Sequence, residues 1–387
     1  MVNYVFLSVY FYSVPNLRFR EFNEQLVYTS FGHVMKLYRG SSPRPIINYV
    51  TTDKSGLNWI KIGDMPSTGN RVFFCKERIN KEGSKKSRAV YKGDIILSNS
   101  MSFGKPYILE IDGFIHDGWF VIRDYQNYID KTYLCQLLSS DAVQKQYKST
   151  AAGGVVKNIS SDLVNSVKFH LPSIMEQRKI ARFLELIDQK IEVQIKIIDT
   201  LSSQKKQIRN LLFKDIHKNA NCCIQDYVIY EQPQKYIVHS TDYLSYGKDY
   251  TPVLTANQSF ILGYTLEKDG IYEKGDCIIF DDFTNENKYV DFPFKVKSSA
   301  LKILQTKEGL MLKFFYEYLQ FLNFESTDHK RHYLSEVAVT DISVPNLKEQ
   351  TFVCKIFTSF DNKLRNEKAL LEKYRLQKQF LLNNLFI

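Results

Sequence analysis

The chain has 387 residues, of which 44% are hydrophobic and 14% aromatic, so it suits two or three domains and its composition excludes a disordered protein. Its formal net charge of +10 permits a polyanionic partner without proving one. Six cysteines without a CxxC pair favour reduced thiols in a cytoplasmic protein over a disulfide framework, with structural zinc as the second interpretation.

The first 21 residues precede the first globular pattern. Their apolar run is interrupted by Asn3, Ser8 and Ser13 and lacks the basic segment that opens a signal peptide. It is also shorter than the roughly 20 apolar residues of a membrane helix. We therefore expect residues 1–21 to form a strand-like or poorly ordered lead-in outside the following domain, and we expect no membrane association.

Residues 22–170 carry the pattern of a first α+β domain. The stretches NWIKIGDM, YKGDIILSNS and GWFVIR are short apolar or alternating runs between turn residues and indicate strands, and Lys131–Gln146 indicates a helix. Residues 1–170 have 22 Lys and Arg against 14 Asp and Glu, with the densest basic cluster in CKERINKEGSKKSRAVYKG. That cluster predicts either contacts to a phosphate backbone or a solvated hairpin tip.

A long amphipathic helix follows at 171–219. Ser173 and Glu176 have the spacing of a helix cap, and from Ser173 onward the segment contains neither Gly nor Pro. At 1.5 Å per residue, about 38 helical residues give a rod of about 55–60 Å.

Residues 220–343 repeat the outline of the first domain. YTPVLTANQ, YEKGDCIIF and SSALKIL indicate strands, and Gly309–Phe324 indicates a helix. The tripeptide KGD precedes an apolar triplet in both regions, at 92–94 and 274–276, which predicts a turn before a buried strand. This region has 12 Lys and Arg against 18 Asp and Glu, so its charge alone does not indicate nucleic-acid binding.

The long helix returns at 344–387, capped by Asn346 and Glu349. Leu171–Phe213 aligns on Val344–Phe386 without a gap, with ten identities: Pro172/Pro345, Glu176/Glu349, Gln177/Gln350, Asp188/Asp361, Lys190/Lys363, Gln204/Gln377, Lys205/Lys378, Asn210/Asn383, Leu212/Leu385 and Phe213/Phe386. A repeat of long period predicts a duplicated structural unit. The copies differ at Arg178-Lys179, which Thr351-Phe352 replaces.

Each helix has an apolar stripe that needs a partner. We expect the two copies to pack on each other as an antiparallel pair, in preference to each lying only on its own domain. The predicted packing residues are Leu184, Ile187, Ile191, Ile195, Ile198, Leu201, Ile208 and Leu212 in the first copy and Phe357, Phe360, Leu364, Leu371, Tyr374, Leu381 and Leu385 in the second.

The sequence has no recognisable catalytic motif: no phosphate-binding loop, GxGxxG, HExxH or GxSxG. Asp281, Asp282, Glu286 and Lys288 could hold Mg²⁺, but a polar hairpin loop is the preferred interpretation. His329 and His332 lack further ligands at metal-binding spacing. We therefore predict no catalytic and no metal site. The candidate DNA-binding residues are Arg39, Lys81, Lys85, Lys86, Arg88, Lys105, Lys157, Lys288, Lys295, Lys297, His329, Lys330 and Arg331.

The stretch LPSIMEQRKIARFLELIDQKIE resembles the helical region of type I restriction-modification specificity (S) subunits, and VPNLKEQ with FDNKL resembles its second copy. RGSSPRP, YKGDIILSNSMSFG and GGVVKNISSDLVNSVKFHLP extend the resemblance over almost all of the chain after about residue 14. It implies an α+β chain with target-recognition domains at 22–170 and 220–343, each followed by a long helix, at 171–219 and 344–387. The two helices would pair as an antiparallel coiled-coil connector.

The resemblance also implies a non-catalytic subunit that reads a two-part asymmetric sequence in double-stranded DNA. The paired helices would set the length of the unread spacer and dock methyltransferase subunits, expected to be two. S-adenosylmethionine, ATP and Mg²⁺ would belong to these and to restriction subunits, and this chain would bind no cofactor. The alternatives are an autonomous Mg²⁺-dependent nuclease and a coiled-coil scaffold without sequence specificity.

Overall fold

The computed structural model describes residues 14–66, 69–99, 104–151, 159–247, 249–255, 260–324 and 332–387. The chain divides into two compact units, residues 1–196 with 369–387 and residues 197–368. Both long helices cross from one unit to the other, because α6 spans Ile174–His217 and α9 spans Leu347–Asn384. Among the described residues, no helix is both long enough and apolar enough to span a membrane.

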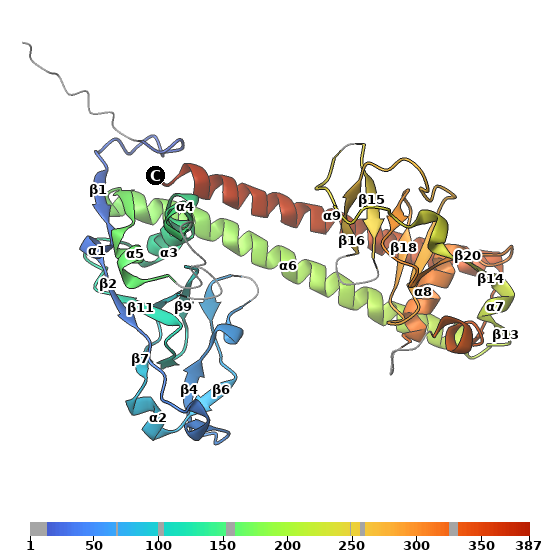
Figure 1. The fold of residues 1–387 in the computed structure, drawn as a ribbon, viewed down its shortest axis with the longest axis horizontal. Coiled ribbons are helices and arrows are strands. Elements are labelled where there is room, and N and C mark those ends of the chain that lie inside the picture. The colour runs from blue at the N-terminus through green and yellow to red at the C-terminus, as the bar shows by residue number, and fades with distance from the viewer. Residues whose placement is uncertain are drawn as a thin grey trace, which may run out of the picture. The chain divides into compact units, whose positions relative to one another are not determined.

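Unit 1 contains two five-stranded sheets, ordered β2-β11-β8-β9-β5 and β3-β6-β4-β10-β7, and the short pair β1-β12 (Figure 1). Its strands are β1 (Val27–Ser30), β2 (Lys36–Arg39), β3 (Val50–Thr51), β4 (Leu57–Ile60), β5 (Arg71–Val72), β6 (Glu77–Ile79), β7 (Arg88–Val90), β8 (Ile95–Ser98), β9 (Pro106–Leu109), β10 (Gly113–Ile115), β11 (Trp119–Arg123) and β12 (Lys168–Leu171). Its short helices are α1 (Phe31–Val34), α2 (Lys81–Lys85), α3 (Lys131–Ser139), α4 (Asp141–Ala151) and α5 (Ser161–Ser166).

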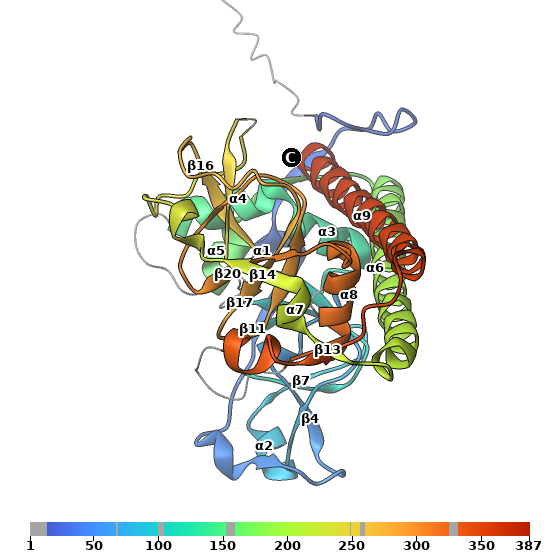
Figure 2. The same cartoon turned by 90° about the vertical axis from the view of Figure 1, so that its right-hand side faces the viewer.

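Unit 2 contains sheets ordered β14-β20-β17-β18 and β16-β15-β19 and the short pair β13-β21 (Figure 2). Its strands are β13 (Cys222–Cys223), β14 (Val228–Glu231), β15 (Thr251–Leu254), β16 (Ile261–Thr265), β17 (Cys277–Asp281), β18 (Asn287–Val290), β19 (Lys295–Val296), β20 (Leu301–Thr306) and β21 (Asp341–Ile342). Its short helices are α7 (Ile224–Tyr227) and α8 (Leu312–Leu322).

The two units share one topology. The antiparallel order β2-β11-β8-β9 in unit 1 matches β14-β20-β17-β18 in unit 2, and the parallel pair β4-β10 matches β15-β19. The repeated KGD turns lie at equivalent places, before β8 and before β17, with Gly93 at φ +91° and Gly275 at φ +93°. Only glycine adopts such angles at little cost, which explains why this residue recurs.

In each unit the largest core lies between a sheet, the short helices and the two long helices. In unit 1 it joins Leu97 and Leu134 to Leu184 of α6 and Leu385 of α9. In unit 2 it joins residues of β17, β20 and α8 to Phe213 of α6 and Phe357 of α9. The long helices therefore belong to the cores of the domains as well as to each other.

The expected elements differ from the structure in three respects. The helix expected over Lys131–Gln146 is broken into α3 and α4 at Ser140. Residues 14–21 are anchored on unit 1 because the Arg18 guanidinium binds both oxygens of Glu176, at 2.8 and 2.7 Å. Glu176 is therefore held by Arg18, whereas Asn346 and Glu349 form the expected cap of α9.

Candidate nucleic-acid interface

A glutamine fixes the start of α6 on the domain before it. Gln177 is 1% exposed, and its Nε2 donates to the carbonyls of Tyr128 and Pro172, each at 3.0 Å. Its Oε1 accepts from the N–H of Asp130, the residue that caps α3, at 2.8 Å. All three bonds are shielded from water, so they hold the helix at one angle to the domain.

Gln350 makes the same three bonds in unit 2. Its Nε2 donates to the carbonyls of Gly309 and Pro345, and its Oε1 accepts from the N–H of Met311, the residue before α8. Gln350 is 0% exposed. Because Gln177 and Gln350 are aligned in the repeat, the two domains are attached to their long helices by the same set of hydrogen bonds.

The far end of each helix packs on the other domain of the repeat. In unit 1, the ring centre of Phe386, near the end of α9, lies 5.3 Å from the ring centre of Tyr133 on α3. In unit 2, the ring centre of Phe213, near the end of α6, lies 5.1 Å from that of Phe314 on α8. Each domain is therefore held by the start of one long helix and the end of the other, in the same way in both copies of the repeat.

Two ion pairs join the helices in the same crossed way. In unit 1 the Nζ of Lys378 on α9 lies 2.5 Å from Asp188 of α6. In unit 2 the Nζ of Lys205 on α6 lies 2.6 Å from Asp361 of α9. Asp188 aligns with Asp361 and Lys205 with Lys378, so each acid binds the lysine of the opposite copy. The helices run antiparallel in both units (Figures 1 and 2).

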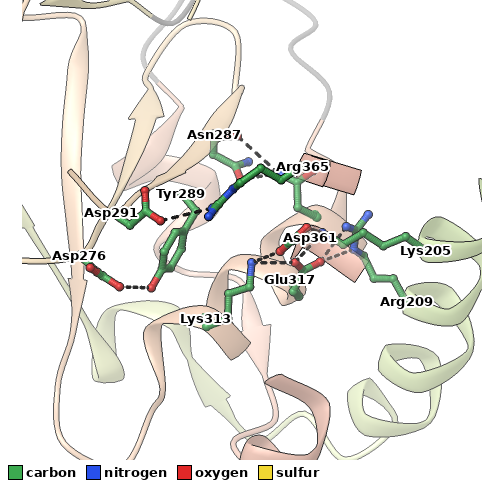
Figure 3. Close-up of polar contacts among 11 residues, drawn as sticks. Lys205, Arg209, Asp276, Asn287, Tyr289, Asp291, Lys313, Glu317, Asp361 and Arg365 are labelled. Atoms are coloured by element: carbon green, nitrogen blue, oxygen red, sulfur yellow. Dashed lines mark hydrogen bonds and ion pairs between the residues drawn. The ribbon is translucent and has the colours of Figure 1, made fainter. Parts of the chain in front are cut away.

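The pair in unit 2 belongs to a larger buried network. Glu317 of α8 is fully buried and binds Lys205 at 2.9 Å, Arg209 at 2.7 Å and Lys313 at 3.3 Å. Figure 3 shows these cations converging on Glu317 and Asp361 from α6 and α8. Burial alone would raise the pKa of Asp361, but its hydrogen bonds from Lys205 and Lys313 lower that pKa below the ordinary value.

Unit 1 has fewer charged side chains at the position equivalent to Glu317. Gln136 of α3 is the counterpart of Glu317, since each lies five residues after the first residue of its short helix. The Gln136 amide donates to Asp188 at 2.9 Å. The counterparts of the cations Arg209 and Lys313 are the uncharged Leu382 and Thr132. One neutral amide therefore replaces an acid together with two of its cations.

The strongest candidate for DNA contact in unit 1 is a group of arginines around one acid. Asp117 accepts from the Ser42 hydroxyl at 2.7 Å and from Arg44 at 3.1 Å, and the Ser42 bond is the main cause of its lowered pKa. Arg39 donates to the Asp117 carbonyl at 3.3 Å, and Arg88 donates to the Arg39 carbonyl at 3.1 Å. Two of the expected DNA-binding residues thus lie together, and Arg44 joins them.

Arg44 and Asp117 of this group line a surface hollow of about 810 Å³. Its lining includes Arg44, Trp59, Lys61, His116 and Asp117. The Arg44 side chain is 80% exposed, so its guanidinium reaches solvent while Asp117 orients it. Burial lowers the pKa of His116, which keeps its imidazole neutral at pH 7. Guanidinium, imidazole and carboxylate groups at one concavity are the groups that recognise base edges and phosphates.

The lysines of the dense basic cluster lie on and beside α2. Lys81 begins the helix and is exposed, and Lys85 pairs with Glu82 at 2.7 Å. Lys86 contacts the hydroxyl of Tyr49 at 2.6 Å. Their side chains end at solvent, which a phosphate-backbone contact requires.

Lys105 lies apart from that group. Its Nζ is 5.0 Å from the centre of the Tyr107 ring, and burial followed by the charge of Lys378 lowers its pKa. Lys105 is therefore placed beside α9. Four further candidates lie outside the described residues: Lys157, His329, Lys330 and Arg331.

In unit 2 the expected basic residues differ in exposure. Lys288 on β18 and Lys297 after β19 are exposed. Lys295 is 0% exposed, and its Nζ is held by Glu267 and by the carbonyl of Asp269, both at 2.7 Å. The expectation that Lys295 contacts DNA is wrong, because an ammonium satisfied inside the core cannot reach a phosphate.

The acids considered for a nuclease site are occupied by structural bonds. Asp281 accepts from the N–H groups two and three residues ahead and turns the loop after β17. Asp282 accepts from the N–H of Tyr333 at 2.9 Å and pairs with Lys302 at 3.2 Å. Their exposed fractions are 7% and 2%. This geometry supports the hairpin interpretation of the loop.

Histidines near acids were considered as metal ligands. His332 contacts Glu336 at 3.0 Å, and its proposed companion lies outside the described residues. Within the described part of the chain, one group of three ligand types gathers closely, His239, Glu267 and Asp269. Glu267 already accepts from a buried lysine and two backbone N–H groups, so its oxygens are engaged.

The residues expected between the helices are all buried or half-buried. Leu184, Ile187, Ile198, Leu201, Phe357, Leu371, Leu381 and Leu385 are buried. Ile191, Ile195, Ile208, Leu212, Phe360, Leu364 and Tyr374 are half-buried. Several of them also belong to the domain cores, which the stripe alone did not indicate.

Comparison with known proteins adds sequence and fold similarity. The model for the Type I restriction modification DNA specificity domain matches residues 32–203. The EcoR124I/EcoR124II type I restriction enzyme specificity subunit of Escherichia coli is 48% identical over 123 residues, 30% of this chain and 30% of that protein. The HindI specificity subunit of Haemophilus influenzae is 27% identical over 163 residues, 40% of this chain and 34% of that protein. The matches thus span about a third of each relative.

Two solved structures share the fold. The S subunit of a type I restriction-modification system from M. genitalium has a TM-score of 0.60 at 16% identity, covering 97% of this chain and 99% of that one. A chain from a structure on complex assembly and conformational transition of the type I R-M system has a TM-score of 0.55 at 14% identity, covering 92% and 96%. Residues 32–203 are thus similar in sequence to the type I restriction modification DNA specificity domain, and the chain shares its fold with the solved S subunit.

Proposed function

We propose that the chain is the DNA sequence-recognition subunit of a type I restriction-modification complex. Each domain reads one half of a two-part target in double-stranded DNA. The observation that carries this proposal is the internal repeat of one framework with different surfaces. Both units have the same sheet topology, the same glutamine attachment (Gln177 and Gln350) and the same crossed ion pair. Their surfaces differ, because the hollow beside Asp117 belongs to unit 1.

The paired helices serve as the spacer and as the surface for methyltransferase subunits. α6 and α9 are single uninterrupted helices, and their aligned attachment points set where each domain begins. Each copy of the helix repeat would dock one methyltransferase subunit, which gives the expected two. Those subunits, and any restriction subunits, supply S-adenosylmethionine, ATP and Mg²⁺, and this chain supplies recognition without catalysis.

Exchange of the second domain tests the proposal. Residues 222–343 would be replaced by the corresponding domain of another specificity subunit, with the long helices left unchanged. Methylome sequencing of a host that expresses the hybrid with its methyltransferase should show one altered half-site and one retained half-site. Alteration of both half-sites would contradict the assignment of one domain to each half. Methylation without sequence preference would favour the scaffold alternative.

A further inference from the structure

The two ends of the helix pair differ in what covers them. In unit 1, residues 14–22 lie over the start of α6 and the end of α9. Leu17 donates its N–H to the carbonyl of Asn384 at 2.9 Å, and Phe19 packs edge-on against Phe183 with the centroids 5.9 Å apart. Together with the Arg18–Glu176 pair, this segment presents an apolar, a basic and an aromatic side chain in succession.

The equivalent place in unit 2 is an open groove of about 550 Å³. It is formed by the end of α6 and the start of α9, and its lining residues Leu211 and Phe352 are 69% and 62% exposed. Among the described residues, none buries this apolar surface. Exposed apolar patches of this kind mark interaction sites.

The repeat identifies which features of the unit 1 site are retained in this groove. Glu349 is the counterpart of Glu176, but it is exposed and accepts from Asn346 in place of an arginine. The counterparts of Asn384 and Lys179 are Leu211 and Phe352. The groove therefore keeps the acid that bound an arginine and is more apolar than its twin.

We propose that the groove of Leu211, Glu349 and Phe352 binds an extended segment of a partner subunit with an arginine between large apolar residues. The arginine pairs with Glu349, and the flanking apolar side chains cover Phe352 and Leu211. The bond from Leu17 has no counterpart, because α6 continues to His217 and the Leu211 carbonyl lies within the helix. Recognition in unit 2 therefore depends on side chains. Only the identity of the partner as a subunit of the complex rests on the proposed function.

A peptide with the sequence of residues 14–24, VPNLRFREFNE, is the probe. Its own site in unit 1 is filled by the intact chain, so binding to the full-length protein reports the groove in unit 2. Fluorescence anisotropy should show saturable binding. Phe352→Ala, which removes the exposed ring, should weaken it about 10-fold, and Glu349→Gln should weaken it about 3-fold. Phe380→Ala is the matched control, since Phe380 is similarly exposed at 57% on the same helix, and it should leave the affinity unchanged.

A photo-crosslinking residue in place of the peptide's leucine, at the position of Leu17, locates the bound probe. Crosslinks to residues 211–216 or 347–353, which border the groove, are expected. Crosslinks to 174–183 or 380–387 would show displacement of the chain's own segment and overturn the proposal, as would equal binding to Phe352→Ala and wild-type protein. Sedimentation of the chain alone distinguishes the occupants: a dimer lost on Phe352→Ala would overturn a partner subunit in favour of a second copy. These readouts use no DNA, so failure here leaves the recognition proposal to its own test.

Discussion

Lys378 of the second long helix lies 2.5 Å from Asp188 of the first, and the lysine and acid at the mirrored positions make the second contact, Lys205 with Asp361. The stretch from Asp188 to Lys205 has the same length as the stretch from Asp361 to Lys378. Because both copies have the same spacing between acid and lysine, both crossed ion pairs can form. The identity of these four residues is explained by pairing between copies.

A double-mutant cycle measures this pairing. Lys378 and Asp188 side chains are 26% and 28% exposed, so solvent screens their attraction only in part. We expect Asp188→Asn and Lys378→Gln to be coupled by about 1–2 kcal/mol in the free energy of unfolding, at the upper end for ion pairs that keep some solvent contact. Urea denaturation of the four proteins gives the coupling. Additivity within about 0.3 kcal/mol would show that the pair contributes nothing to stability.

Neutralising Glu317 alone should lower the free energy of unfolding. Glu317→Gln leaves Lys205, Arg209 and Lys313 with one acid, and loss of one partner from a buried ionic cluster costs about 3–5 kcal/mol. Adding Arg209→Leu and Lys313→Thr recreates the arrangement of unit 1, where Gln136 serves Asp188. The triple variant should be more stable than Glu317→Gln, measured by thermal and urea unfolding. If it is less stable, the two units do not use equivalent solutions.

Acid should weaken the unit 2 network. The pKa of Asp361 is lower in the folded chain than in the unfolded one, so the unfolded state binds this proton more readily. The stabilisation from Asp361 is therefore complete above about pH 4, the ordinary pKa of aspartate, and is lost as the pH falls through the folded value. The difference in unfolding free energy between wild type and Asp361→Asn should shrink over that window. A difference that grows on acidification would contradict the assigned direction.

The arginines around Asp117 should control DNA binding by the first domain. Arg44→Ala and Arg88→Ala should each weaken binding to the cognate duplex about 10-fold, because each removes an exposed cation from the group around Asp117. A variant that removes only a phosphate contact should also reduce the salt slope by about one. Lys145→Ala is the control, since Lys145 is 78% exposed on α4 and lies outside the group. Equal losses in Lys145→Ala and Arg44→Ala would mean that net charge, and not this surface, governs affinity.

Much of the fold could be predicted from the sequence, because the spacing of apolar residues and the turn residues between them are visible there. Apolar spacing predicts the two long helices and the strands in NWIKIGDM, YKGDIILSNS and GWFVIR, and the KGD tripeptide predicts a turn at its glycine. The break between α3 and α4 is not predicted, because no glycine or proline marks it: Ser140 has extended backbone angles and its hydroxyl donates to the Leu137 carbonyl.

The candidate site was harder to predict, because basic residues show their charge in sequence but not their partners. Lys295 lies in a run like that of Lys297, yet it is buried against Glu267. The sequence does not single out Arg44, because only the structure shows that Arg39 and Arg44 both donate hydrogen bonds to Asp117. The polar identities of the helix repeat, Gln177/Gln350 above all, were the signal for the attachment points. Polar residues kept in both copies of an amphipathic helix indicate contacts that an apolar stripe cannot supply.

The most direct test of the account lengthens both helices together. Seven residues would be inserted between Asp188 and Lys205 and seven between Asp361 and Lys378, which keeps the apolar stripe and both crossed pairs. At 1.5 Å per residue, the insertion adds about 10 Å, roughly three base pairs. Methylome sequencing with the partner methyltransferase should show both half-sites unchanged and the spacer longer by roughly three base pairs. Changed half-sites, or an unchanged spacer in a stably folded variant, would contradict the account.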